Sequence, residues 1–317
     1  MVYDLIPFFN EIDILRLRLG VLSPCVDKFI IEEAVETFSG QKKELCFEKN
    51  RDKFKDYLDK IVYIKVTDTL ENAKTHERDY FQKNHLIKGL EEVGATEDDV
   101  IIFGDCDEIP NPKVLRDITK DFDKTLVYHL AQRNFYAFLN MEESSGKLLS
   151  ITGEFPDIPE SDRKWLGTKI TSLRNIPKEG IVRLRDLCKV TDPNAVRVAD
   201  GGWHFGYMGG EHVTDPIKRI GEKVMAAAHQ EYSEREVILE TVDRLALGQD
   251  IFGRDATFKR VEVDGSFPEY LLKHISEYDY LVMPYISPFK KFYHKFDLTV
   301  GRFCRKALRK IKRMFAK

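Results

Sequence analysis

An unbroken apolar run at Val100–Phe103 constrains the fold of this chain more than any other feature. Such a run, apolar on both faces, is typical of a strand buried inside a parallel sheet. Extended and helical patterns alternate before it: residues 2–9, 26–31 and 61–66 for the strands, and residues 11–22 and 73–93 for the helices. Strands that alternate with helices predict an α/β sheet with helices on both of its faces.

The second half of the chain is less regular. Residues 126–139 are predicted to form one or two strands, and residues 215–232 and 233–247 to form helices. Residues 142–163 are polar and predicted to form a loop. No internal repeat or low-complexity segment interrupts this pattern.

The composition is that of an ordinary globular protein of 317 residues, and a net charge of −3 gives no reason to expect a nucleic-acid partner. The N-terminus does not have the pattern of a signal peptide, and no apolar stretch approaches the length needed to span a bilayer. The scattered cysteines form no Cys-x-x-Cys pair, which argues against a disulfide framework and a zinc site: Cys25, Cys46, Cys106, Cys188 and Cys304. These features predict a reducing, cytoplasmic compartment.

Three carboxylates follow the buried run: Asp105, Asp107 and Glu108. Ligands bind at the carboxyl ends of strands in α/β sheets, and alternate residues of an extended chain point the same way. Asp105 and Asp107 are therefore predicted to converge on a divalent cation that would bridge diphosphate oxygens. A solvated turn before Pro110 is one alternative. Another is a haloacid-dehalogenase-like phosphatase with Asp105 as its nucleophile, although Glu108-Ile109-Pro110 fits that class poorly.

A segment rich in glycine and aromatic residues covers residues 201–210. His204 lies within it, and a neutral imidazole is a good partner for a carboxylate-bound transition metal such as manganese. Paired glycines permit close approach of the backbone to a ligand. Trp203 and Tyr207 are candidates for stacking on a sugar. The alternatives are a structural role for His204 and burial in the core for the aromatics.

Several blocks carry, in order, a resemblance to a known family: Tyr3-Asp4 with residues 7–11, Glu33 with residues 37–40, and residues 78–84, 104–110, 201–210 and 248–252. On these blocks, which span roughly residues 2–256, the chain resembles glycosyltransferase family 17. The resemblance implies an A-type glycosyltransferase (GT-A) fold, with a Rossmann-like, mixed and mostly parallel sheet flanked by helices. It also implies a UDP-N-acetylglucosamine donor, a divalent metal (Mn²⁺ or Mg²⁺) and inversion at the anomeric carbon.

The animal member of that family has a transmembrane anchor that this sequence does not show, so its glycoprotein acceptor is not carried over. A glycan, free or linked to a lipid, is the acceptor expected here. Residues 1–260 are predicted to form the catalytic domain and residues 261–317 a C-terminal extension. A non-catalytic glycan-binding protein on the same fold is the alternative.

The resemblance also suggests roles for individual residues. Asp107 is expected to bind the metal directly and Asp105 through water, with His204 completing the site. The candidates for binding the donor are Pro7, Asn10, Glu11, Glu33, Arg78, Gln82, Asp105 and Trp203. Inverting transfer needs a carboxylate that takes the proton of the acceptor hydroxyl, and the candidates are Asp250, Glu211 and Glu108. The candidate phosphate partners are Lys218, Lys223 and Arg254.

Ordinary structural roles compete with several of these assignments. Asn10 and Glu11 also suit the cap of the following helix. Glu33 also suits a surface turn, and Arg78 an ion pair with a neighbouring acid. A solvated helix face is the alternative for Lys218 and Lys223.

The end of the sequence is strongly basic: residues 302–317 contain eight lysines or arginines and no acid. Their apolar residues recur at helical spacing, which predicts a basic amphipathic helix on an anionic membrane surface. The protein is then expected to be peripheral, at the cytoplasmic face of a membrane. A helix docked on the protein body and a nucleic-acid-binding arm are the alternatives.

Overall fold

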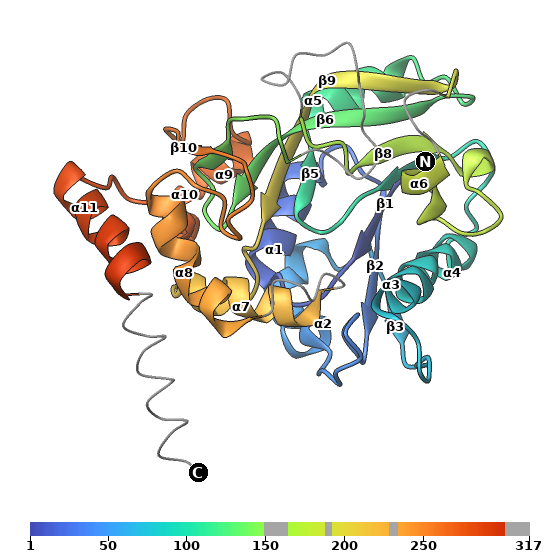
Figure 1. Ribbon diagram of the computed structural model, residues 1–317. Coiled ribbons are helices and arrows are strands. Elements are labelled where there is room, and N and C mark those ends of the chain that lie inside the picture. Colours follow the sequence, from blue (N-terminus) through green and yellow to red (C-terminus); the bar gives the residue numbers. More distant parts are fainter. Residues whose placement is uncertain (149–163, 188–191, 228–233, 302–317) are drawn as a thin grey trace.

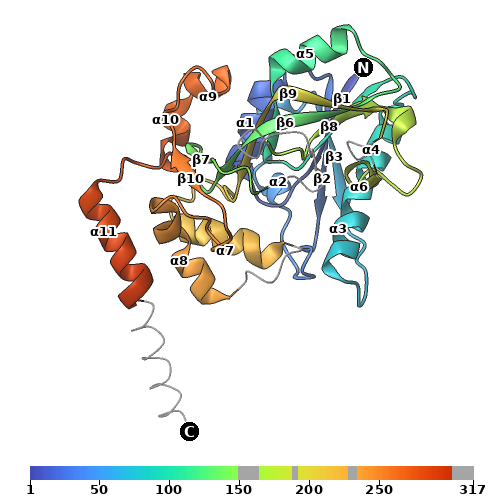
Figure 2. The ribbon, with the colours of Figure 1, turned by 45° about the horizontal axis from the view of Figure 1, so that its top comes forward.

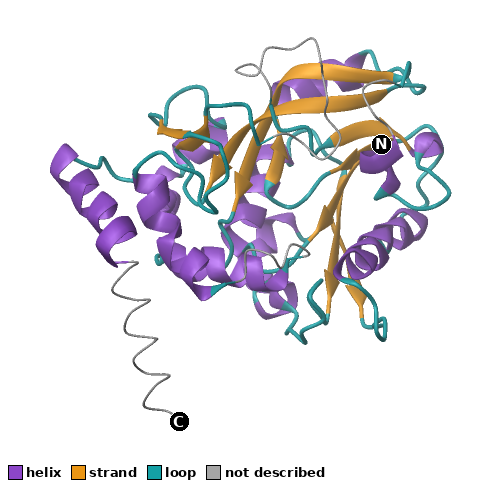
Figure 3. Ribbon diagram, viewed as in Figure 1, coloured by secondary structure: helices purple, strands orange, loops and turns teal. Residues whose placement is uncertain are grey.

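The computed structural model describes residues 1–148, 164–187, 192–227 and 234–301 (Figure 1). Its strands are β1 (Val2–Pro7), β2 (Lys28–Ala34), β3 (Ile61–Val66), β4 (Val100–Phe103), β5 (Glu108–Pro110), β6 (Val127–Tyr136), β7 (Met141–Glu143), β8 (Lys169–Ser172), β9 (Ala195–Gly206) and β10 (Phe258–Arg260). They form one ten-stranded mixed sheet in the order β10-β7-β6-β8-β4-β1-β2-β3, with β9 beside β6 and β5 beside β9. Figure 3 shows the strands in orange with helices around them. The predicted α/β fold, with a mixed sheet and flanking helices, is confirmed.

The helices are α1 (Ile12–Leu22), α2 (Cys46–Lys49), α3 (Thr75–Asn84), α4 (Leu86–Glu92), α5 (Pro112–Lys120), α6 (Arg183–Leu187), α7 (Pro216–Ala226), α8 (Arg235–Ala246), α9 (Glu269–Lys273), α10 (Ile275–Tyr278) and α11 (Pro288–Phe296). Shorter helical turns are η1 (Arg51–Tyr57), η3 (Leu173–Asn175), η5 (Asp279–Leu281) and η6 (Asp297–Gly301). The single helix predicted at residues 73–93 is in fact two, α3 and α4, which meet at His85.

The parallel part of the sheet consists of β4, β1, β2 and β3. All four residues of β4 are buried, as predicted for the run Val100–Phe103. Side chains of β1 alternate between two apolar layers, because a strand has a period of two residues. Leu5 packs in the layer that contains α4, and Ile6 in the layer that contains α1. The helices therefore cover both faces of this half of the sheet.

Antiparallel strands continue the sheet beyond β4, with β8 next to β4 and β6 next to β8. The long strand β9 runs parallel to β6, and β5 returns antiparallel to β9. In this register Glu108 lies opposite His204. The carboxylates after β4 and the glycine-aromatic segment, which are about a hundred residues apart in sequence, are thus neighbours in the sheet.

Part of the predicted C-terminal extension packs on the domain. Phe267, Leu271 and Tyr278 are buried in the same apolar cluster as α1. By contrast, α11 lies at the periphery in both views (Figure 1, Figure 2). The predicted basic helix at residues 302–317 and most of the predicted loop at residues 142–163 lie outside the described residues. Within the described residues, no helix is both long and apolar enough to cross a membrane.

Candidate functional site

A cavity of about 600 Å³ opens at the carboxyl ends of β1, β2 and β4. Its walls also come from α3, α6, the end of β9 and α7. Ligand sites in α/β sheets lie at this edge. Several predicted site residues line the cavity, among them Pro7, Glu11, Gln82, Asp105, Asp107, His204 and Lys223.

A buried arginine of α1 holds the loop after β4 in place. Arg18 is fully buried and pairs with Asp4, at 2.8 Å from Nε to Oδ2 and 2.7 Å from Nη2 to Oδ1. Its Nη1 also donates to the backbone carbonyls of Asp105, at 2.8 Å, and Glu108, at 2.7 Å. One side chain therefore satisfies the carbonyls of the loop and fixes where its carboxylates point.

Asp105 faces two cations. Its Oδ1 lies 2.9 Å from Nζ of Lys83 and its Oδ2 lies 2.9 Å from Nη1 of Arg185. Burial alone would raise the pKa of Asp105, but Arg185 and Lys83 hold that pKa well below its ordinary value. Asp105 is therefore ionised, and its side chain keeps 32% of its surface exposed. Each of its oxygens is paired with one side chain, and the predicted water-mediated metal contact stays a prediction.

Asp107 and His204 face each other across the cavity floor, with 3.8 Å between Oδ1 and Nε2. His204 Nδ1 lies 2.8 Å from Oδ1 of Asn134, an amide oxygen that can only accept. Nδ1 can therefore donate to Asn134, which leaves Nε2 facing Asp107. Trp165 stacks on the imidazole, with ring centroids 4.3 Å apart, and fixes the plane of the ring.

Lys223 brings a third cation to the site from α7. It forms an ion pair with Glu11, and its Nζ lies 3.7 Å from Oδ2 of Asp107. Burial would lower the pKa of Lys223, but Glu11 and Asp107 raise it, so the ammonium is charged. Burial raises the pKa of Asp107. Lys83, Arg185 and Lys223 thus surround the carboxylates with positive charge that an anionic ligand can also use.

The two glutamates at the end of β2 have opposite environments. Glu33, the predicted donor-binding residue, is fully buried on the other side of the sheet and accepts from Lys43, from the backbone N–H groups of Cys46 and Phe47, and from the Tyr63 hydroxyl. The structure therefore assigns Glu33 a structural role. Glu32, which the sequence analysis did not single out, lines the cavity instead, and its Oε1 accepts no hydrogen bond from the described residues.

Burial raises the pKa of Glu32 to about 8, which gives a pH-dependent prediction. The unfolded chain releases this proton near pH 4.5 and the folded chain only near pH 8, so the wild type loses stability as the pH rises between these values. In Glu32→Gln that loss is absent. The variant should gain on the order of a few kcal/mol over the wild type between pH 6 and 9. Thermal unfolding at a series of pH values measures the difference.

Glu44→Gln is the matched control, because Glu44 lies on the surface with its side chain 75% exposed. Its unfolding temperature should follow that of the wild type at every pH. Parallel curves for the wild type and Glu32→Gln would show that Glu32 does not hold a proton in the folded state.

Four other residues predicted to bind the donor or phosphate do not line the cavity and have other contacts. Arg78 lies 3.5 Å from Glu36 and donates to the carbonyl of Leu70, so the ion-pair alternative holds. Trp203 donates from Nε1 to the carbonyl of Ser266 and is buried in the core. Asn10 contacts the glycine loop, where its backbone carbonyl accepts from the N–H of Gly210. Arg254 pairs with Asp250.

None of the three predicted catalytic bases lines the cavity. Glu108 is fully buried and accepts from Arg185, Trp165, Thr168 and the N–H of Asp105. Asp250 is also fully buried, paired bidentately with Arg254. The carboxylate oxygens of both residues accept hydrogen bonds from several donors, and these contacts hold the neighbouring loops in place. Glu211 also forms an ion pair, with Lys53, but its side chain is 45% exposed and it follows the cavity residue Tyr207 by four positions.

Residues that the sequence analysis missed supply much of the wall. Lys83 comes from α3, Trp165 from the segment before β8, and Arg185 from α6. Only Lys83 had a signal, since it lies in the resemblance block at residues 78–84.

Tyr207, directly after β9, has a φ of 65°, a left-handed conformation that is strained for an aromatic residue. Such strain occurs often at functional sites.

The donor atoms near the floor fit a divalent metal in part. Among the described residues no group of three or more His, Cys, Asp or Glu side chains is arranged to hold a metal ion. Asp107 and His204 can still supply a carboxylate and an imidazole, and the imidazole Nε2 already faces Asp107. Mg²⁺ and Mn²⁺ sites often use one or two protein ligands together with substrate phosphates. Asp107 and His204 fit such a site, whereas Asp105 is held by cations.

Comparison with known proteins gives one family. The model of glycosyltransferase family 17 matches residues 1–147. This part of the chain belongs to glycosyltransferase family 17. The predicted family and the predicted enzyme class, a glycosyltransferase, are thereby confirmed. The matched part ends before β8, so Arg185, His204 and Lys223 lie beyond it.

Other comparisons are weaker. No curated protein sequence matches the chain. A solved structure of 4-diphosphocytidyl-2C-methyl-D-erythritol synthase is 16% identical with a TM-score of 0.35, over 62% of this chain and 87% of that one. The structure of S. aureus TarS, residues 1–349, is 10% identical with a TM-score of 0.34, over 78% of this chain and 70% of that one. The fold of this chain therefore rests on its own sheet order.

Proposed function

We propose that this family 17 glycosyltransferase moves N-acetylglucosamine, or a related sugar, from a UDP-sugar to a hydroxyl of a glycan acceptor, with inversion and with a divalent metal. The observation that carries the proposal is the floor of the cavity. Asp107 and His204 face each other there, beside the three cations Lys83, Arg185 and Lys223. A nucleotide diphosphate is the ligand class that needs both a metal-binding pair and a ring of positive charge.

Asp107 and His204 would hold the metal, which would supply positive charge to the diphosphate leaving group. Lys83 and Arg185 keep Asp105 ionised, and both could also form ion pairs with the oxygens of a diphosphate. Glu32 and Gln82 line the part of the cavity at the ends of β2 and α3, where polar groups would contact the nucleoside. Glu211, which pairs with Lys53, is the candidate for the base, since its partly exposed carboxylate follows the glycine loop and can take the proton of the acceptor hydroxyl.

A thermal-shift panel of nucleotide sugars with and without Mn²⁺ tests this proposal. At a concentration about 100-fold above Kd, a ligand stabilises the folded state by about 2.7 kcal/mol. The expected result is a rise in Tm of several degrees with UDP-N-acetylglucosamine and Mn²⁺, and a much smaller rise without the metal. GDP- and CMP-sugars at the same concentration serve as matched controls.

Each alternative predicts a different outcome. Stabilisation by a GDP- or CMP-sugar in place of the UDP-sugar would overturn the donor assignment. Release of inorganic phosphate from simple esters, without UDP binding, would favour the phosphatase with Asp105 as nucleophile. Stabilisation by glycans alone, with no response to any nucleotide sugar, would favour the non-catalytic glycan-binding protein.

The place of action is part of the proposal. The basic residues 302–317 support peripheral association with an anionic membrane at its cytoplasmic face. An acceptor linked to a lipid would then lie next to the enzyme. This part of the proposal rests on the sequence alone.

A further inference from the structure

The helix α11 exposes an unusual number of aromatic side chains. Phe289, Phe292, Tyr293 and Phe296 have exposed fractions of 69%, 64%, 57% and 50%. They occupy positions i, i+3, i+4 and i+7, which share one face of a helix. Tyr285, just before the helix, is 70% exposed. Isolated exposed aromatics are common, but a continuous aromatic face marks an interaction site.

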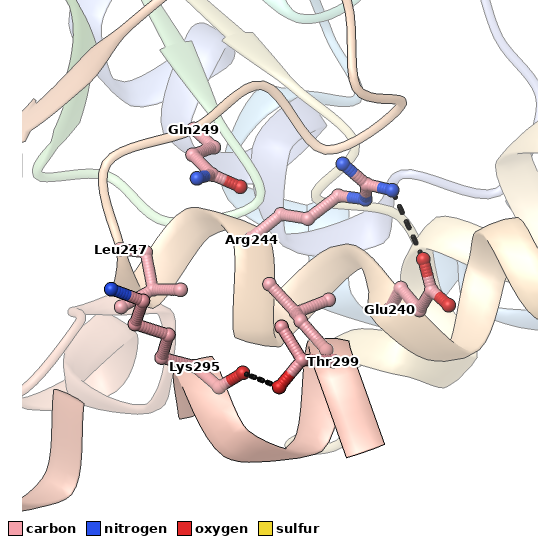
Figure 4. Close-up of a pocket in the computed structure, with 7 residues that line it drawn as sticks. Glu240, Arg244, Leu247, Gln249, Lys295 and Thr299 are labelled. Carbon is pink, nitrogen blue, oxygen red and sulfur yellow. Dashed lines mark hydrogen bonds and ion pairs between the residues drawn. The ribbon is translucent and has the colours of Figure 1, made fainter. Parts of the chain in front are cut away.

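The opposite side of α11 fixes the direction in which this face points. His294 Nδ1 lies 2.7 Å from Oδ1 of Asp243 on α8. The following turn η6 leaves a small cavity of about 240 Å³ against α8, lined by Glu240, Arg244 and Lys295 among others (Figure 4). Since α8 covers one side of α11, the aromatic face is directed away from the body. Figures 1 and 2 agree that α11 stands at the edge of the molecule.

Basic residues outnumber acids around the aromatic face, although Asp297 caps the end of α11. Residues 284–296 contain Lys290, Lys291 and Lys295 and no acid. Residues 302–317 add eight more basic residues close by in the chain. A second copy of the chain would bring these like charges together, which is unfavourable. Phe and Tyr rings interleaved with lysine are instead suited to the boundary between lipid headgroups and acyl chains.

We propose that the aromatic face of α11, made of Phe289, Phe292, Tyr293 and Phe296, inserts into the interface of an anionic lipid bilayer. This surface is distinct from residues 302–317, because it holds the membrane by apolar insertion and the basic segment holds it by charge. It is also independent of the sugar-transfer reaction. The cavity at the ends of β1, β2 and β4 contains no residue of α11.

Co-sedimentation of the full chain with vesicles tests this inference. The vesicles are phosphatidylcholine mixed with phosphatidylglycerol, and the variant is Phe292→Ser/Phe296→Ser. Loss of two inserted rings is expected to weaken vesicle binding about tenfold or more. High salt screens the contribution of the basic residues. The wild type should therefore still bind vesicles more tightly than the double variant in high salt.

The matched control is Met225→Ser, because Met225 is an exposed apolar residue of α7, 42% exposed. It should bind vesicles as the wild type does. No binding by the wild type, or equal binding by Phe292→Ser/Phe296→Ser, would overturn the inference. The inference would also be overturned if the wild type were a dimer in solution and the double variant a monomer, since the face would then be an interface between copies. The double variant should keep the donor-induced rise in Tm, so this test is separate from that of the proposed function.

Discussion

Replacing Asp107 with asparagine is expected to lower kcat for sugar transfer by about 10²–10³-fold, the usual cost of removing one group that stabilises developing charge. Asparagine keeps the shape of the side chain but loses the negative charge that would bind the metal. Burial raises the pKa of Asp107, so removing the charge should leave the folded state as stable as before, or more stable. Initial rates and Tm, measured on the same preparation, separate the two effects.

The matched control is Asp117→Asn on α5, where the carboxylate is 65% exposed and pairs with Lys113 at the surface. Its activity and metal response should equal those of the wild type. The variant Asp107→Asn should also lose the additional rise in Tm that Mn²⁺ gives with the UDP-sugar. Wild-type rates in Asp107→Asn would remove Asp107 from the site and with it the basis of the proposed mechanism.

Arg18→Met is expected to have the largest effect on stability, a loss of about 3–5 kcal/mol. Methionine fills similar space, but it leaves Asp4 as a fully buried carboxylate without a partner. The carbonyls of Asp105 and Glu108 also lose their donor. Urea-induced unfolding measures the free energy of unfolding, with the midpoint and the slope reported separately.

Arg16→Met, two residues earlier in the same helix, is the matched control. Arg16 is 31% exposed and its ion pair with Glu277 lies at the surface, so the variant should lose less than about 1 kcal/mol. The double variant Asp4→Leu/Arg18→Met should recover part of the loss, because it removes the unpaired charge but not the unsatisfied carbonyls. Equal stability of Arg16→Met and Arg18→Met would mean that the buried arginine does not hold the loop.

Local patterns predicted the parallel half of the sheet, because buried strands and amphipathic helices leave clear periodic signals. The run Val100–Phe103 and the following Asp105 and Asp107 are the best example, since strand, loop and cavity edge follow from one short segment. The pair Glu32 and Glu33 shows where this reasoning stops. Which glutamate faces the cavity depends on α2 and Tyr63 covering the other face, and that contact joins residues up to 30 positions apart.

The rest of the site depends on contacts that no local pattern records. Trp165 reaches His204 only because a bridge joins Gln132 to Trp165 at the side of β6. Arg185 comes from a region without regular periodicity, yet it pairs with both Asp105 and Glu108. The resemblance supplied Asp107 and His204 as partners. Their distance and the role of Asn134 became visible only in the folded chain.

The countercharges of the site also set an order of assembly. Glu11, Asp105 and Asp107 lie within residues 1–107, as does Lys83, whereas Arg185 and Lys223 come far later. A partly synthesised chain would therefore hold these acidic groups close together with Lys83 but without Arg185 and Lys223, so their repulsion would be only partly compensated. The remaining countercharges join the site only when α6 and α7 are in place. A chain truncated before them would contain the whole family 17 match and still lack a complete site.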